Sequence, residues 1–151
     1  MKLQETRRYH LLSLFIALVF TLTMYSTKAQ AQIVGTLEAD IPFQFHVGNA
    51  KLPAGKYNIR MLDNTDLKVM EISSADGSSS AVFEVREAEA KSAPAESELI
   101  FGKYGDRYFL DKLFDGSNLS GSAVIKSSYE KKMAEAATEG VEKVPAHHRG
   151  S

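Results

Sequence analysis

The sequence contains no cysteine, and this absence excludes three kinds of structure. Without a thiol the chain has no lipid-anchored cysteine, no disulfide framework and no thiolate metal site. Export to an oxidising compartment is still compatible with the sequence, because disulfides are permitted there rather than required.

Motifs that mark catalysis are also missing. Serines are abundant at 78–80 and between 117 and 128, but none stands in the G-x-S-x-G pattern of a nucleophile elbow. Glycine-rich phosphate loops are absent as well. A glycoside hydrolase needs two carboxylates that flank a cleft, and the pattern singles out no such pair. The sequence therefore predicts no catalytic residue and no cofactor.

Histidine is scarce, and no pattern turns it into a site. His46 is the only histidine between residues 32 and 140, and no partner for a general base can be identified beside it. We expect a solvent-facing or hydrogen-bonded strand histidine there. His147 and His148 lie near the end of the chain, where adjacent side chains on a flexible segment lack the fixed geometry of a metal site. We predict no metal site.

The longest apolar run, residues 11–24, is too short for a membrane-spanning helix of about 20 residues. Basic residues precede the run, and Ala29-Gln30-Ala31 follows it. This order predicts a secretory signal peptide over residues 1–31, cleaved after Ala31. The mature protein is then exported to the periplasm or the medium and has no transmembrane segment. An uncleaved amino-terminal anchor is the alternative.

A positive charge excess is lacking too. Residues 32–151 hold 14 Lys and Arg against 18 Asp and Glu, a net charge of −4. Mild acidity disfavours nucleic acid and anionic membrane surfaces as partners. The 120 residues that remain after cleavage are enough for one domain.

What the sequence does have is short runs of alternating apolar residues. Residues 36–47 alternate with the period of a half-buried strand, and 57–61 continue the pattern after turns at 48–49 and 53–55. Asp76-Gly77 predicts one hairpin, and Gly105-Asp106 predicts another with strands at 98–104 and 107–114. On the last strand the period places Phe109 and Leu113 on one face and Leu110 on the other.

The carboxy-terminal part changes character. Ser127 and Glu130 match a capping box, and Gly140 is a suitable helix end, which predicts an amphipathic helix over residues 127–140. Residues 141–151 are expected to form a flexible tail.

Together these patterns predict an antiparallel β domain over residues 32–126. We expect a compact barrel or sandwich of six to eight short strands, with the carboxy-terminal helix packed on it. The expected core residues are Phe43, Phe45, Val47, Tyr57, Ile59, Val69, Phe83, Phe101, Leu110 and Leu113.

Two stretches carry a resemblance, IPFQFHVGNAKLPAGKYNI at 41–59 and FGKYGDRYFLDKLF at 101–114. They are similar to the "IPF-x-F-x-VGN-x-x-LPAG-x-Y" opening and the "YGDRYFL" hairpin of an uncharacterised family of small exported bacterial proteins. The resemblance implies export. It transfers no catalytic residue.

For function, the most suggestive cluster is Tyr104, Arg107 and Tyr108, because exposed tyrosines beside an arginine are typical of interfaces and sugar-binding surfaces. Tyr57 and Arg60 are a second choice. The leading hypothesis is a noncatalytic exported protein that binds an envelope component or a partner protein. The alternatives are a carrier of a small apolar or sugar ligand inside a barrel and, last, a hydrolase acting on envelope polymers. The oligomeric state does not follow from the sequence.

Overall fold

The chain divides into two units, residues 1–30 and 31–151. The computed structural model describes residues 35–62 and 68–150, all within the second unit. The predicted signal peptide over 1–31 and its cleavage after Ala31 lie outside the described residues.

Strands dominate the described residues. The elements in chain order are β1 (Thr36–Ile41), β2 (Phe45–Val47), β3 (Ala50–Leu52), β4 (Gly55–Leu62), β5 (Val69–Ser74), β6 (Ser80–Glu89), β7 (Glu98–Tyr104), β8 (Arg107–Phe114), β9 (Ser120–Val124), α2 (Ser128–Ala136) and β10 (Glu139–His148). The β7–β8 hairpin begins and ends where its sequence predicts, because Gly105 takes the positive φ of 65° that a tight turn needs.

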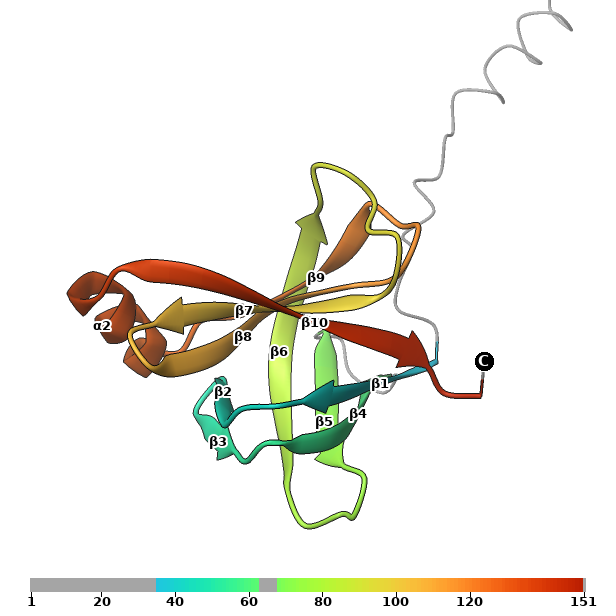
Figure 1. The fold of residues 1–151 in the computed structure, drawn as a ribbon, viewed down its shortest axis with the longest axis horizontal. Helices are drawn as coiled ribbons and strands as arrows, with labels where there is room; N and C mark the ends of the chain where they lie inside the picture. The colour runs from blue at the N-terminus through green and yellow to red at the C-terminus, as the bar shows by residue number, and fades with distance from the viewer. Residues whose placement is uncertain (1–34, 63–67, 151) are drawn as a thin grey trace, which may run out of the picture. The chain divides into compact units, whose positions relative to one another are not determined.

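Eight strands close into an antiparallel barrel in the order β8-β7-β10-β1-β4-β5-β6-β9, and β9 pairs back to β8. The two ten-residue strands make this closure possible, since each changes neighbour along its length. Residues 80–84 of β6 pair with β5, and 85–89 pair with β9. Residues 139–145 of β10 pair with β7, and 146–148 pair with β1 (Figure 1). The predicted all-β fold is thus confirmed, and of its two alternatives, barrel and sandwich, the structure has the barrel.

The β2–β3 hairpin lies outside the closed ring of strands. β2 pairs antiparallel with β3 and parallel with the first residues of β8. β8 has a free edge there because its pairing with β9 begins only at Lys112. Helix α2 lies beside the turn between β7 and β8 (Figure 1). These additions surround one end of the β7–β8 hairpin, and they position the site described below.

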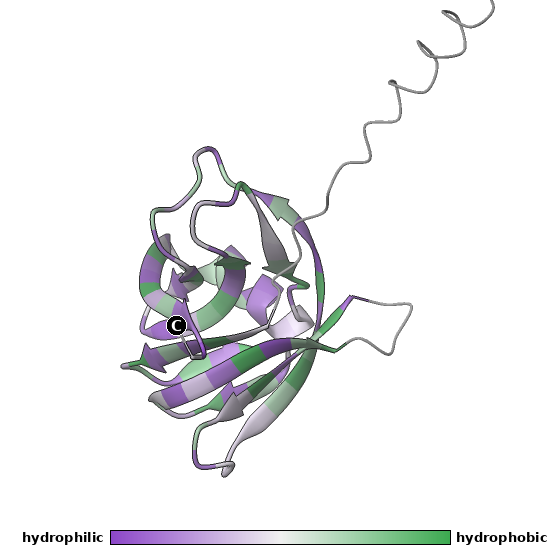
Figure 2. Ribbon diagram, turned by 90° about the vertical axis from the view of Figure 1, so that its right-hand side faces the viewer, coloured by the Kyte–Doolittle hydropathy of each residue, from purple (hydrophilic) through white to green (hydrophobic). Residues whose placement is uncertain are grey.

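The core fills the inside of the barrel. Hydrophobic and polar residues alternate along the strands, as Figure 2 shows by colour, and the apolar ones form one buried cluster. Phe45 and Leu52 belong to this cluster although their strands stand outside the ring. The expected core residues are buried, with the exception of Phe43 and Val69, which are half-buried.

The flexible tail predicted over 141–151 is wrong. Residues 139–148 form β10, which is hydrogen-bonded on both sides as a wall of the barrel. Helix α2 is correspondingly shorter than the predicted 127–140. It ends at Ala136, because Ala137 adopts an extended backbone, with φ −137° and ψ 156°, that leads into β10.

Strand β8 also departs from simple alternation. A register shift between Ile100 and Phe101 leaves Phe101 opposite Leu110 and Ile100 opposite Lys112, so that Asp111 has no partner. An extra residue in one strand reverses the faces that follow it. Leu110 and Leu113 therefore both enter the core, which corrects their expected placement on opposite faces.

Candidate functional site

A pocket of about 480 Å³ lies between the β2–β3 hairpin, the β7–β8 turn and helix α2. We refer to it as the helix-side pocket. Its lining residues come from three separate parts of the chain and are Phe43, Gln44, His46, Lys51, Asp106, Arg107, Tyr108 and Tyr129. Three of them are basic, and three carry phenyl or phenol rings.

The β2–β3 hairpin places two of the basic groups side by side. His46 pairs directly with Lys51 across the hairpin. Gly48 takes a positive φ of 57° in the connecting turn, a conformation that glycine adopts without steric cost. The His46 ring stacks on Phe109 of β8, with ring centres 4.8 Å apart and planes 19° apart.

The β7–β8 turn supplies the third basic group and one ring. Arg107 is exposed at the start of β8, next to Asp106 in the turn. Tyr108 is half-buried and stacks on Phe43, with ring centres 3.9 Å apart. Lys103 lies over the Tyr108 ring, 5.2 Å from its centre. The Tyr108 ring thus has an aromatic and a cationic neighbour.

Helix α2 closes the pocket through Tyr129. This side chain is 38% exposed, and its ring lies 5.5 Å from His46 and 5.8 Å from Phe109 between ring centres. Arg107 Nη1 donates to the Tyr129 hydroxyl and to Met133 Sδ, the latter at 3.3 Å. Arg107 therefore joins the barrel to the helix on the pocket's rim.

The electrostatics of the pocket favour negative charge in a ligand. Burial lowers the pKa of His46, and the charges of Lys51 and Arg107 lower it further. Within residues 35–62 and 68–150, no carboxylate forms an ion pair with Lys51 or Arg107. The two cations raise the local positive potential, and Asp106 is the one carboxylate of the described lining that opposes them.

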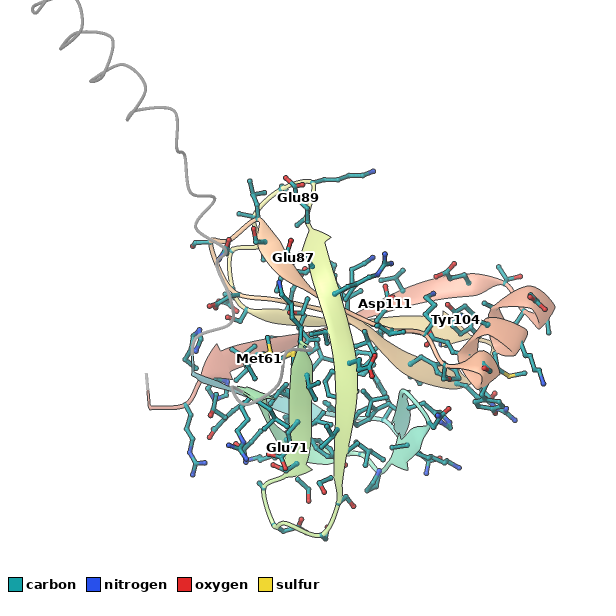
Figure 3. The ribbon with its side chains drawn as sticks, turned by 180° about the vertical axis from the view of Figure 1, so that it is seen from behind. Met61, Glu71, Glu87, Glu89, Tyr104 and Asp111 are labelled. Carbon is teal, nitrogen blue, oxygen red and sulfur yellow. The ribbon has the colours of Figure 1, made fainter. Side chains whose placement is uncertain are left out.

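Tyr104, which the sequence places in an exposed cluster, is 2% exposed and lies between the barrel and α2 (Figure 3). Its hydroxyl accepts a hydrogen bond from Lys126 Nζ at 2.8 Å and donates to Glu139 Oε1 at 3.4 Å. Lys126 also forms an ion pair with Glu130 of the helix at 3.6 Å. The expected exposure of Tyr104 is wrong, and its contacts hold α2 against the barrel.

The second-choice residues lie away from the helix-side pocket. Tyr57 is buried in the core, and its hydroxyl donates to the Pro53 carbonyl oxygen at 2.7 Å. Arg60 is exposed on β4 and forms an ion pair with Glu71 at 2.6 Å. Of the predicted binding residues, the structure brings only Arg107 and Tyr108 into the pocket.

Sequence reasoning missed the other pocket residues as a group. The signal for His46 and Lys51 was present, because a two-residue turn at Gly48-Asn49 places them opposite each other. Nothing in the sequence indicates that β2 pairs in parallel with β8, or that Tyr129 reaches both strands. These contacts depend on the tertiary fold.

The adjacent histidines of β10 occupy fixed positions. His147 Nε2 lies 3.6 Å from Glu38 Oε2, and His148 Nε2 lies 2.8 Å from Asp115 Oδ1. Among the described residues, no group of three or more histidine or acidic side chains is arranged to hold a metal ion.

A second pocket, of about 710 Å³, lies between the β2–β3 turn, the first half of β6 and the segment before α2. Val82 and Ile125 are exposed at this pocket. Most of its lining is uncharged, so its chemistry selects no particular ligand.

No family model, curated protein or solved structure matches the chain.

Proposed function

We propose that the protein is an exported, noncatalytic binding protein that holds an envelope component or a partner protein at the helix-side pocket. The observation that carries the proposal is the convergence of His46, Lys51 and Arg107 beside aromatic rings, with no ion pair to either Lys51 or Arg107 in the described part of the chain. Cationic and aromatic side chains that converge in a hollow are typical of binding sites.

The carrier alternative needs room inside the barrel. Side chains from all eight barrel strands and from the β2–β3 hairpin lie in or against the core cluster. Several of the largest, among them Phe45, Tyr57 and Phe101, are fully buried. This packing favours a ligand bound on the outside over one enclosed in the interior.

The hydrolase alternative requires a general base or acid in the pocket. The charges that shift the pKa of His46 are those of Lys51 and Arg107, whereas a carboxylate partner is the usual orienting group for a catalytic histidine. Activity on envelope polymers that disappears in His46→Gln or Asp106→Asn would revive this alternative.

Export rests on the predicted signal peptide over 1–31 and on the resemblance to exported bacterial proteins. The mature protein would then be located in the periplasm or the medium. In the part of the chain that the structure describes, no helix has the length and apolar character needed to cross a membrane.

The test is native mass spectrometry of the protein purified gently from the envelope and medium of the cells that produce it. We expect a protein lacking residues 1–31, with an additional mass bound to it. The additional mass should be lost from Lys51→Glu and retained by Lys91→Glu, which reverses an exposed charge in the loop after β6. The proposal would be contradicted if the protein from both the envelope and the medium carried no additional mass. It would also be contradicted if Lys51→Glu and Lys91→Glu retained the additional mass equally.

A further inference from the structure

We infer that the helix-side pocket binds an acidic sugar, whose oxyanion contacts Arg107 and Lys51 and whose hydroxyl groups contact Asp106 and Gln44. This inference rests on the proposed function and deepens it by naming the ligand class.

The helix-side pocket has an excess of basic groups. The whole chain carries a net charge of −1, yet the basic groups of this pocket outnumber its single carboxylate, that of Asp106. Other basic residues of the barrel, such as Arg60, Lys68 and Lys143, are paired with a glutamate. Lys51 and Arg107 have no such pair among the described residues. Other exposed basic residues, such as Lys56 and Arg86, share this property, but only Lys51 and Arg107 line the helix-side pocket together, where a bound anion would meet little competition.

The guanidinium of Arg107 supplies hydrogen-bond donors to the pocket. A guanidinium has five N–H groups in a planar fork. At Arg107, the hydrogen bonds to the helix side chains Tyr129 and Met133 all use Nη1. The Nε and Nη2 donors have no acceptor in the described part of the chain, and these two nitrogens match the two oxygens of a carboxylate. The helix contact holds the guanidinium in place without using its fork.

The polar residues of the lining favour a sugar over a bare anion. Asp106 lines the same pocket and repels a free oxyanion, but its carboxylate accepts hydrogen bonds from hydroxyl groups. Gln44 adds an amide that can donate and accept. A ligand that carries both an oxyanion and hydroxyl groups satisfies both halves of this lining.

The Tyr108 ring and the volume of the pocket restrict the ligand further. Phe43 stacks on one face of the Tyr108 ring, and Lys103 Nζ lies 5.2 Å from the ring centre, so little of the ring surface is left for stacking a neutral sugar. A sugar would therefore contact mainly the edge and the hydroxyl of Tyr108. The charges of Lys51 and Arg107, and not ring stacking, would then distinguish an acidic sugar from a neutral one. A volume of about 480 Å³ lies in the range of small-ligand pockets and suits one or two sugar rings.

The test is isothermal titration calorimetry of the protein, as purified from the producing cells, with three probes. Glucuronate carries a carboxylate, glucose 6-phosphate carries a phosphate, and glucose carries neither. We expect at least one of the acidic probes to bind about tenfold or more tightly than glucose, because a charge-assisted pair contributes on the order of 1.4 kcal/mol or more. The acidic probe that binds identifies the source of the oxyanion.

Variants locate the binding. Lys51→Gln removes an exposed charge that has no ion pair, and Arg107→Gln removes the guanidinium. Each should weaken binding of the acidic probe about tenfold. The melting temperature of Lys51→Gln should stay close to that of the unchanged protein, which separates the binding effect from any loosening of α2 in Arg107→Gln. The matched control is Arg86→Gln, which removes an exposed arginine of β6 that does not line the pocket.

Two results would overturn the inference. One is equal binding of glucose and the acidic probes. The other is an affinity for the acidic probes that Lys51→Gln and Arg107→Gln leave unchanged. If the native additional mass is still lost from Lys51→Glu, only the ligand class fails and the proposed function stands; if no additional mass is found, both fail.

Discussion

Asp115 connects three parts of the barrel through one carboxylate oxygen. Ser97 Oγ, just before β7, donates to Oδ1 at 2.7 Å, and His148 Nε2, at the end of β10, lies 2.8 Å from the same atom. Partial burial raises the pKa of Asp115, but the hydrogen bonds from Ser97 and His148 and the charge of His148 together lower it below the ordinary value.

A depressed folded-state pKa means that ionised Asp115 stabilises the fold above its ordinary pKa of about 4, and that this contribution is lost as the pH falls through the lower folded value. We expect Asp115→Asn to lose about 1 kcal/mol of stability at about pH 5, after allowance for solvent screening at these partly exposed groups. The loss should shrink toward about pH 2. Urea unfolding across this range measures it, and a loss independent of pH would contradict the assignment.

Gly121 is required for the close approach of β8 and β9. A Cβ at this position would lie 2.4 Å from the Leu113 carbonyl oxygen and from Phe114 Cδ1. Gly121→Ala must therefore push the two strands apart, and we expect a loss of about 1–3 kcal/mol by urea unfolding. Gly140→Ala in β10 is the control, because its added Cβ would make only ordinary contacts at 3.6 Å or more. Equal stability of the two variants would show that β8 and β9 separate without cost.

Helix α2 depends on its amino-terminal cap. The Ser127 side chain accepts a hydrogen bond from the Glu130 backbone N–H at 3.1 Å, as the capping box predicts. Ser127→Ala should reduce stability by about 1 kcal/mol, whereas Ser128→Ala, one residue into the helix, should change it little. Chemical unfolding of the two variants compares them directly, and an unaffected Ser127→Ala protein would rule out the cap.

Strand β10 occupies the residues for which the sequence predicted a flexible tail, so substitutions in it test whether they form a wall of the barrel. Val144 is 3% exposed and belongs to the core, while Val141 on the same strand is 64% exposed. Val144→Asp buries an unpaired charge, which costs several kcal/mol and should prevent stable folding. Val141→Asp should melt close to the unchanged protein. Two variants with equal melting temperatures would mean that residues 139–148 do not form a barrel wall.

The contrast between β8 and β10 shows what local sequence can predict about elements. The β7–β8 hairpin is encoded locally, by alternating aromatic and aliphatic residues around Gly105-Asp106, and its bounds were predicted correctly. β10 contains charged residues and a proline, which are poor strand signals. Pro145 is tolerated because it lies where the pairing with β7 ends and the pairing with β1 begins. Only the completed fold determines that position.

At the scale of the whole molecule, Phe45 links the outer hairpin to the barrel core. It is fully buried, and its ring lies 5.3 Å from Tyr57 and 5.5 Å from Phe101 between ring centres. Phe45→Asp should abolish soluble folding, because a core charge without a partner costs several kcal/mol. Val82→Asp, at a 62% exposed position of β6, is the control. A Phe45→Asp protein with an unchanged melting temperature would contradict this packing.

The fold class was predictable from local sequence, whereas most of the helix-side pocket depends on contacts between distant residues. Alternation and turns act over a few residues, so the sequence predicts strands, a barrel or sandwich, and most of the core. The helix-side pocket joins Lys51, Arg107 and Tyr129, which are widely separated in the chain. Their proximity follows from the parallel pairing of β2 with β8 and from the docking of α2, which have no local signature.

The position of β10 between β7 and β1 has a consequence for the timing of folding. A polypeptide is made from its amino terminus, and β1 is among the first barrel strands to emerge while its neighbour β10 is the last. The edge of β7 that faces β10 stays unpaired until residues 139–145 have been synthesised, and that of β1 until residues 146–148 follow. The barrel therefore cannot close until β10 has been added to the chain, so its closure depends on pairing between strands far apart in the sequence.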